Sequence, residues 1–437
     1  MEPRRRNPWW IPPFLGRVPE GLDARHLRLL GLMALGLAFE QYNLSLVNSA
    51  IQQIADDLGM GMGDIGRYTG AVRLGGFFSF LLVPLADRLG RRRLFLVSLL
   101  GMSITALATA VVQTPFQYAL VQLVARAFLL TTAALAVVIV VEEFPAAHRG
   151  WGLGMLVAVS AFGYGVGVGL FAAVDSLPFG WRALYVPGVL TLFLIPFFRR
   201  ELRETARFES HRAASGGSGG AGVRGWLAPV LRLARTHPVR AAAVGAAGLF
   251  GAMGSIAVFQ YLSPFVQTVH GWRPWQYSLM VISGGLLGMA GNVVGGRLAD
   301  RLGRRWVGLA AYGLYPASVA AFYHGPAWAL VLAWVFIVFL GTAGDVVTRA
   351  LSTELFPTSH RSTAMGWLTL LQTAGWTLGL VLVGSGTAVA GDIGRTVSWM
   401  ALVAALAGVA LWTLPESGRR ELEEVSGEAF PRPAGEG

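Results

Sequence analysis

The chain of 437 residues contains no cysteine, and all 35 of its basic residues are arginine. Without cysteine the protein forms no disulfide bond and no thiolate metal site. Without lysine it has no phosphate-binding loop of the Gly-x-x-x-x-Gly-Lys type, which excludes work driven by ATP hydrolysis. The seven histidines do not cluster. We therefore expect no metal, no cofactor and no enzymatic activity.

Charged residues are also scarce, because they make up 14% of the chain whereas 54% of its residues are hydrophobic. The mean hydropathy of +0.55 fits no ordinary soluble chain. Several windows of about 20 residues are almost free of charge, which is long enough to cross a hydrocarbon core of about 30 Å. Clear cases are residues 94–113, 306–324 and 396–414. The lipid bilayer is therefore the expected solvent.

Hydropathy and helix breakers predict an all-α membrane protein with twelve transmembrane helices. An even number of spans with arginine-rich ends places both termini in the cytoplasm. The arginine-poor loop at 51–64 then lies on the outer side. The predicted spans are residues 28–50, 65–86, 94–113, 116–141, 151–174, 181–198, 240–268, 276–299, 306–324, 327–351, 362–390 and 395–414.

The net charge of +11 is explained by membrane topology rather than by nucleic-acid binding. Most of the arginines fall in the termini and in one set of alternate loops, and basic residues concentrate on the cytoplasmic side of membrane proteins. The same residues attract anionic lipids. We expect a multi-pass protein of the bacterial inner membrane that acts as a monomer and binds no nucleic acid.

A polar stretch at residues 199–239 separates the sixth predicted span from the seventh. It contains the run AASGGSGGAG at 213–222, whose composition is typical of a flexible linker. The sequence therefore predicts two halves of six spans each. The domain bounds are 1–27 for a cytoplasmic N-terminal segment, 28–198 for the first bundle, 199–239 for a cytoplasmic linker, 240–414 for the second bundle and 415–437 for a cytoplasmic tail.

Three short motifs occur once in each half, at offsets of 213, 212 and 212 residues. Because the offset is the same to within one residue, we infer that a unit of about 210 residues was duplicated. The motifs are DRLGRR at 87–92 and again at 300–305, EEFPAAHRG at 142–150 with ELFPTSHRS at 354–362, and LRETAR at 202–207 with LPESGR at 414–419.

These paired motifs resemble the signatures of the major facilitator superfamily of secondary transporters. The DRLGRR copies resemble its loop signature after spans 2 and 8, and the E-x-x-P-x-x-x-R strings resemble the ends of spans 4 and 10 in its sugar-porter-like branch. The third pair resembles the P-E-S/T-x-x-R strings after spans 6 and 12, although Arg203 replaces the first proline. The resemblance implies two pseudo-symmetric six-helix bundles around a substrate cavity near the bilayer midplane, with alternating access.

The repeated motifs are expected to form a cytoplasmic gate. An acid among arginines at a helix end, as at Asp87 and Asp300, favours ion pairs with the Glu/Arg strings of the same half. The resemblance implies that such pairs hold the outward-facing state and break on opening; the alternative is a static role in folding. The predicted gate comprises Asp87, Arg88, Gly90, Arg92, Glu142, Arg149, Glu204, Asp300, Arg301, Gly303, Arg305, Glu354, Arg361 and Glu416.

Within this gate we expect Arg92 to pair with Glu142, and Arg305 to pair with Glu354. The other arginines of the two loops are expected only to anchor the loops at the lipid head groups. These other arginines are Arg91, Arg93 and Arg304.

Three ionisable residues fall deep inside predicted spans, where each costs about 2.5–3.5 kcal/mol, so they are functional candidates. Glu40 lies 12 residues after Arg28, about 18 Å along the helix. Arg73 and Arg126 reach similar depths on spans 2 and 4. Burial favours the protonated form of a lone Glu, whereas a nearby Arg favours its ionised form. Glu40 is thus a candidate for proton coupling, and its alternative role is that of a structural partner of Arg126 or Arg73.

The string AFEQYN around Glu40 resembles the F-D-x-Y-D string on span 1 of proton-coupled organic-acid symporters. Glu40 stands where the first Asp stands, and Asn43 where the second stands. Asn43 cannot titrate, so a mechanism that needs both carboxylates is not available. An Arg in a cavity can bind a carboxylate with two hydrogen bonds, so Arg126 indicates an anionic substrate. The alternative for Arg126 is an ion pair within the protein.

Polar residues on spans 1, 7 and 10 complete the predicted substrate site. Asp345 and Arg349 are four residues apart on span 10, a spacing that also favours a simple ion pair along one helix face. The 212-residue offset pairs these two residues with Ala133 and Val137, so the charges are specific to the second half. The candidates for substrate binding are Tyr42, Asn43, Arg73, Arg126, Gln260, Tyr261 and Asp345.

Span 5 carries alternate glycines, Gly163, Gly165, Gly167 and Gly169, which give two G-x-x-x-G faces for close helix packing. It lacks the Gly-Pro pair typical of drug antiporters, and span 7 lacks the Gln-rich string typical of hexose porters. The sequence therefore favours a proton-coupled symporter of a small, anionic organic solute. The alternatives are an efflux antiporter or uniporter, and a sensor of the same fold that binds solute without moving it.

Overall fold

The computed structural model describes residues 8, 10–11, 18–202, 204, 232–357 and 360–417. Within these residues the regular structure consists of helices, with no β-strand. Eleven of the helical segments there are long and apolar enough to cross a membrane. The glycine-rich run at 213–222 and the tail after residue 417 lie outside the described residues, so the linker and the tail remain predictions.

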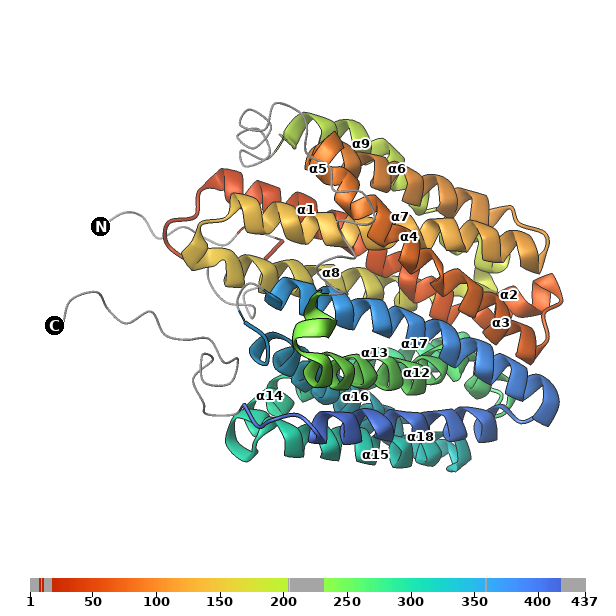
Figure 1. Ribbon diagram of the computed structural model, residues 1–437. Helices are drawn as coiled ribbons and strands as arrows, with labels where there is room; N and C mark the ends of the chain where they lie inside the picture. The colour runs from red at the N-terminus through yellow and green to blue at the C-terminus, as the bar shows by residue number, and fades with distance from the viewer. Residues whose placement is uncertain are drawn as a thin grey trace. The chain divides into compact units, whose positions relative to one another are not determined.

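The first half contains the helices of the first six predicted spans, labelled in Figure 1. They are α1 (Ala24–Ser49), α2 (Ile51–Leu58), α3 (Met62–Arg73), α4 (Gly75–Leu82), α5 (Ala86–Leu89), α6 (Arg91–Ala110), α7 (Pro115–Glu143), α8 (Arg149–Phe171) and α9 (Gly188–Glu201), with the 3-10 turns Val83–Leu85, Ala146–His148, Val174–Ser176 and Gly180–Tyr185.

The second half repeats this order of long helices after the linker. They are α12 (Pro238–Thr268), α13 (Pro274–Gly288), α14 (Ala290–Leu302), α15 (Arg304–His324), α16 (Leu330–Glu354), α17 (Arg361–Ala390) and α18 (Ile393–Trp412), with a 3-10 turn at Ala327–Ala329. Every predicted span thus corresponds to a helix or to consecutive helices.

The differences from the predicted spans have local causes. The second span is broken between α4 and α5 by a 3-10 turn that contains Pro84, which lacks the amide hydrogen needed to continue the helix. The loop expected at 51–64 contains the helix α2. The ninth span, α15, is not among the eleven apolar segments of the described residues, because its tyrosines and glycines reduce its hydropathy.

Contacts divide the chain into two compact units. The first contains α1, α2, α4 to α9 and Arg273–Ser278 at the start of α13. The second contains α3, α12, the rest of α13 and α14 to α18. The predicted domain bounds at 28–198 and 240–414 remain a prediction.

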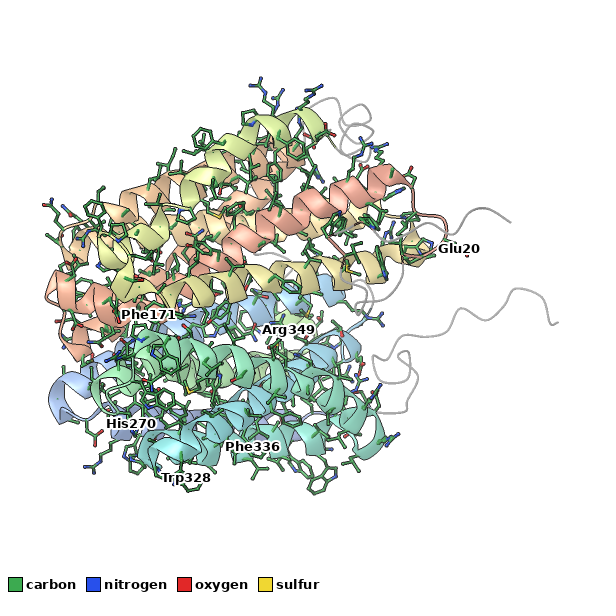
Figure 2. The ribbon with its side chains drawn as sticks, turned by 180° about the vertical axis from the view of Figure 1, so that it is seen from behind. Glu20, Phe171, His270, Trp328, Phe336 and Arg349 are labelled. Carbon is green, nitrogen blue, oxygen red and sulfur yellow. The ribbon has the colours of Figure 1, made fainter. Side chains whose placement is uncertain are left out.

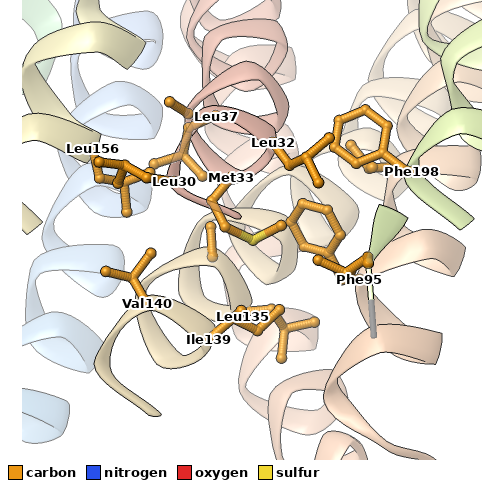
Figure 3. Close-up of a cluster of buried hydrophobic side chains, with 14 of the residues drawn as sticks. Leu30, Leu32, Met33, Leu37, Phe95, Leu135, Ile139, Val140, Leu156 and Phe198 are labelled. Carbon is orange, nitrogen blue, oxygen red and sulfur yellow. The ribbon is translucent and has the colours of Figure 1, made fainter. Parts of the chain in front are cut away.

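The core of the first unit is formed by aliphatic and aromatic side chains from α1, α6, α7, α8 and α9, shown in Figure 3. Met33 of α1 and Phe95 of α6 are completely buried in it. Phe95 also packs against Phe198 of α9, with ring centroids 6.1 Å apart. These contacts fix the rotation of α1 and thereby the direction in which its polar residues point.

Glycines on α8 let this helix pack closely against α1. A Cβ atom at Gly163 would overlap the backbone carbonyl group of Ala38, and one at Gly167 would overlap the hydroxyl of Ser45. No atom lies within 4 Å of the corresponding positions at Gly165 and Gly169. Only one of the two predicted G-x-x-x-G faces is therefore a packing face.

This asymmetry predicts that Gly163→Ala destabilises the protein by about 1–3 kcal/mol, because the added methyl group forces α8 away from α1. Gly165→Ala is the matched control and should leave stability unchanged or raise it slightly, since alanine is the better helix former. Thermal unfolding of the two purified variants in detergent measures the difference. Equal melting temperatures would contradict the close approach of Gly163 to Ala38.

The second unit is built around α12, which packs along α17 and α18, while α15 packs along α16 and α18. The hydroxyl of Tyr323 on α15 donates a hydrogen bond to the carbonyl of Val258 on α12 at 3.1 Å. Helix α3 packs along α17 and receives a hydrogen bond from Tyr261 of α12, whose hydroxyl lies 3.0 Å from the carbonyl of Met62. Tyr261 thus fixes α3 within this unit.

Candidate functional site

Glu40 lies on the buried face of α1, where its residue is 3% exposed. Its Oε2 accepts a hydrogen bond of 2.8 Å from the side-chain amide of Gln41. Arg126 of α7 is 8% exposed and close enough to Glu40 for their charges to interact. The structure therefore brings together the acid of span 1 and the base of span 4 within one unit.

Arg126 carries a buried guanidinium group. Among the described residues it forms no hydrogen bond and no ion pair within 4.0 Å, although it lies in the electrostatic range of Glu40. A buried arginine without a direct partner is costly, and an arriving carboxylate would supply up to two charge-assisted hydrogen bonds. The geometry can therefore bind an anion.

The two other candidates on α1 already have hydrogen-bond partners. The hydroxyl of Tyr42 donates to the backbone carbonyl of Leu184 at 2.5 Å, which ties α1 to the segment before α9. The side-chain amide of Asn43 donates to the carbonyl of Phe39 at 2.8 Å, one turn back along α1. The bond of Tyr42 therefore holds α1 in place next to Glu40, whereas that of Asn43 lies within α1.

An apolar cavity of about 720 Å³ lies between α1, α8 and α9 of the same unit. Its walls include Leu35, Phe39, Phe162 and Leu190, and neither Glu40 nor Arg126 lines it. The pair of Glu40 and Arg126 therefore lies outside this cavity.

Three further candidates belong to the second unit. Arg73 is the last residue of α3 and is 6% exposed. Gln260 and Tyr261 of α12 are fully buried, and the hydroxyl of Tyr261 is engaged by α3 as described above. Of the three, Tyr261 contributes to packing within its unit.

Asp345 and Arg349 of α16 form the expected ion pair, with Arg349 Nε 2.6 Å from Asp345 Oδ2. The other carboxylate oxygen of Asp345 accepts a hydrogen bond of 3.3 Å from the side chain of Gln372 on α17. The side chains of Asp345 and Arg349 are 41% and 47% exposed. This is a partly open polar cluster, in contrast to the buried pair of Glu40 and Arg126.

The two DRLGRR turns have the same geometry. Gly90 and Gly303 adopt φ angles of 97° and 102°, which are accessible to glycine at little cost, and each precedes the first turn of the next helix. The carboxylate of Glu204 accepts a hydrogen bond from the backbone amide of Arg92 at 3.1 Å. Glu416 accepts from the amides of Arg304 and Arg305 at 2.8 and 3.1 Å. Both glutamates therefore stabilise the positive end of a helix dipole.

The expected pairing of Arg92 with Glu142 is wrong. Glu142 instead binds Arg91, whose Nη2 lies 3.3 Å from its Oε1. Arg92 directs its guanidinium to the carbonyl of Arg199. The arginine that directly follows the glycine, rather than the next one, reaches the acid at the end of α7.

The expected pairing of Arg305 with Glu354 is wrong for the same reason. Glu354 binds Arg304, which also lies 3.5 Å from Asp300, and accepts a hydrogen bond of 2.8 Å from Ser417. Arg305 stacks over the ring of Trp412, with 4.5 Å between its guanidinium carbon and the ring centroid. Arg91 and Arg304, predicted to be simple head-group anchors, are thus the ion-pairing residues.

The remaining gate residues play simpler roles. Arg149 and Arg361 donate through Nε to the carbonyls of Phe144 and Phe356, at 3.2 and 3.4 Å, next to the ends of α7 and α16. Arg88 and Arg301 are exposed. Asp87 lies in α5, but its side chain is outside the described set.

A contact between a histidine and a phenylalanine occurs once in each half and was not predicted from the sequence. His26 packs edge-on against Phe144 with ring centroids 5.4 Å apart, and His237 packs in the same way against Phe356 at 5.9 Å. The offset from His26 to His237 is 211 residues, which could have revealed the pair. Burial, helped by the neighbouring Arg240 and His360, lowers the pKa of His237 below its usual range.

The ion-pair pattern predicts that Arg304→Gln lowers the free energy of unfolding by about 1–3 kcal/mol, because Glu354 loses its charged partner. Arg305→Gln is the matched control, and it should lose only a cation–π contact of about 0.5–1 kcal/mol. Thermal unfolding of both variants is the measurement. A larger loss of stability in Arg305→Gln than in Arg304→Gln would contradict this pattern and support the pairing of Arg305 with Glu354 that the sequence predicts.

Long apolar helices, a duplicated order of elements and motifs that occur once in each half define a multi-pass membrane protein built from an internal repeat. The sequence model of the Major Facilitator Superfamily matches residues 33–294 and 276–436, so the chain belongs to this superfamily. It is a secondary transporter.

Curated relatives are similar to most of this chain. A protein of Bacillus subtilis (strain 168) named "Putative niacin/nicotinamide transporter NiaP" is 26% identical over 82% of this chain and 88% of its own length. The gallate transporter of Pseudomonas putida is 24% identical over 78% and 81%. The cis,cis-muconate transport protein of Acinetobacter baylyi is 24% identical over 81% of each.

Solved structures agree on the fold. The inward-open xylose transporter XylE from E. coli matches with a TM-score of 0.73 and 15% identity, covering 92% of this chain and 99% of that chain. A bacterial homolog of the human lysosomal transporter Spinster, inward-facing and unoccupied, matches with a TM-score of 0.72 and 15% identity, covering 90% and 97%. The all-α fold predicted from the sequence is thereby confirmed.

Proposed function

We propose that the chain is a proton-coupled symporter of a small organic solute that carries a carboxylate. The observation that carries this proposal is the buried guanidinium of Arg126, which has no direct partner among the described residues and lies within electrostatic range of Glu40. A bound carboxylate would satisfy the hydrogen-bond donors of Arg126 in the geometry that guanidinium groups favour.

Coupling to protons follows from the same pair of charges. While Arg126 is free, its positive charge stabilises ionised Glu40. When a solute carboxylate neutralises Arg126, this stabilisation of ionised Glu40 is lost. Glu40 then takes up a proton, because burial favours the neutral form of a carboxyl group. Binding of the anion and binding of the proton would therefore favour one another, as symport requires.

The relatives support the class of solute. Gallate and muconate are carboxylates, and niacin is a carboxylic acid, whereas nicotinamide is its uncharged amide. Charged and uncharged solutes of nearly equal shape therefore provide a direct test of the role of Arg126.

The cytoplasmic motifs support alternating access. Each half carries the same set of ion pairs and helix-dipole contacts at its repeated turn, and every one of these contacts joins residues of one unit. We propose that they keep each bundle rigid while the bundles rock, with both termini on the cytoplasmic side of a bacterial inner membrane. Phe356 and Phe144 with their histidines add to the same clusters.

Purified protein reconstituted in liposomes tests the proposal. With the voltage clamped at zero and the outside acidic, we expect nicotinate or gallate to accumulate together with protons, and nicotinamide or methyl gallate not to accumulate. Proton flux opposite to solute flux would indicate an antiporter, and downhill solute flux without proton flux would indicate a uniporter. Binding without any flux would indicate a sensor. Each of these three results would overturn symport.

A further inference from the structure

The polar cluster on α16 has a feature that the proposed function does not use. Arg349 is held by its Nε, which bonds Asp345, while Asp345 is held by Gln372 of α17. Among the described residues the two terminal nitrogens of Arg349, Nη1 and Nη2, have no hydrogen-bond partner. Its side chain is 47% exposed, so these nitrogens are accessible.

Helix periodicity places the cluster on the side of α16 opposite to Phe336. Phe336 is 50% exposed, as an apolar residue on the lipid-facing side of a membrane helix is expected to be. Asp345 follows it by nine residues, which is about two and a half turns, so the two side chains point in opposite directions. Arg349 follows Asp345 by four residues, about one turn, and so lies on the same face. Figure 2 labels Arg349 and Phe336.

The depth of the cluster requires contact with water. Asp345 precedes Glu354, the last residue of α16, by nine residues, or about 14 Å along the helix. Each charge exposed to lipid near the middle of a span costs about 2.5–3.5 kcal/mol. Asp345, which is 41% exposed at this depth, therefore faces an aqueous space, and Arg349 lies one turn nearer to the end of the helix, about 8 Å from it.

We propose that Arg349 is a second carboxylate-binding residue, which engages the transported solute through Nη1 and Nη2. Asp345 and Gln372 are positioning residues that hold the guanidinium with its terminal edge toward the water-accessible side. This inference rests on the proposed function, because it takes the solute to be a carboxylate, and all three residues of the site belong to the second unit.

The negative charge of Asp345 gives this site a specific character. A guanidinium that already contacts one carboxylate attracts a second one less strongly, since the two anions repel each other. The site therefore binds the solute loosely and releases it readily. Removing the charge of Asp345 while keeping its shape should convert the site into a tighter one.

Titration of the purified full-length protein with gallate, followed by tryptophan fluorescence, tests this inference. We expect Arg349→Gln to raise the Kd for gallate about tenfold or more and Asp345→Asn to lower it severalfold, with methyl gallate binding unchanged in both. Because tighter binding slows release, Asp345→Asn should also reduce the rate of gallate counterflow in liposomes. A purely structural ion pair would not tighten gallate binding when Asp345 is neutralised.

Matched variants separate the possible outcomes. Arg395→Gln, which removes an exposed arginine of α18, should leave the Kd unchanged. Arg349→Lys keeps the positive charge but lacks the paired hydrogen-bond donors of a guanidinium group. We therefore expect it to fold like the wild type and to bind gallate with intermediate affinity. Unchanged gallate binding in Arg349→Gln, with binding lost in Arg126→Gln, would overturn this inference alone. Failure of the wild type to bind any carboxylate would overturn the proposed function as well.

Discussion

Glu40→Gln is expected to abolish uphill accumulation of the solute while leaving downhill entry and exchange intact. With one proton carried per carboxylate and the voltage held at zero, a pH gradient of one unit corresponds to about 1.4 kcal/mol and supports about tenfold accumulation. Gln keeps the size of Glu40 and can still accept the hydrogen bond from Gln41, but it cannot take up a proton. The accumulation ratio in liposomes should fall from about ten to about one.

Asp64→Asn provides the matched control for this experiment. Asp64 is also a carboxylate of the first half, but it lies in the first turn of α3, is 43% exposed and pairs with Arg67. Its neutralisation should leave the accumulation ratio unchanged. If Glu40→Gln still accumulates solute tenfold in a pH gradient, another group carries the proton and the proposed coupling is wrong.

Arg126→Gln is expected to weaken binding of carboxylate solutes about 100-fold, which corresponds to about 2.7 kcal/mol. This size is within the range found when one partner of a buried, hydrogen-bonded charge pair is removed. The uncharged analogues nicotinamide and methyl gallate should bind equally well to the variant and the wild type. Isothermal titration with each acid and its uncharged analogue measures both effects.

Arg126→Lys shows whether the shape of the cation matters as well as its charge. A lysine ammonium group keeps the charge but cannot make the paired hydrogen bonds of a guanidinium. We expect an affinity between those of the wild type and Arg126→Gln. If Arg126→Gln lost affinity equally for the acid and for its uncharged analogue, Arg126 would stabilise the fold rather than bind the anion.

The repeated turns illustrate how far the sequence could predict local structure. The sequence DRLGRR predicts a glycine turn between two helices, and the structure has positive φ at Gly90 and Gly303. The acid that caps the next helix comes from more than 100 residues away in both halves, at Glu204 and Glu416. The sequence placed these glutamates in the gate, because they recur at the same offset, but it could not assign their backbone partners.

The choice between adjacent arginines could not be made from the sequence. Arg91 and Arg92 have the same charge and differ by about 100° around the helix axis. Only the packing of α6 against α7 decides that Arg91 points to Glu142. The same holds for Arg304 and Arg305 in the second half.

The pair of Glu40 and Arg126 could be predicted in part from the sequence. Helix rise places Glu40 and Arg126 at similar depths, and this predicts that they can meet. Whether they form a direct ion pair depends on helix rotation, which the burial of Met33 and Phe95 fixes for α1. The structure leaves Arg126 without a direct partner among the described residues, and the proposed anion site depends on this feature.

The sequence by itself determined that this is a polytopic helical membrane protein, where its spans lie, and that one half duplicates the other. These properties follow from hydropathy and spacing along the chain, which are local quantities. The tertiary structure alone decided which arginines are neutralised by acids and which keep open hydrogen-bond donors. A guanidinium finds its partner through the packing angle and rotation of neighbouring helices, which residues distant in the chain determine together.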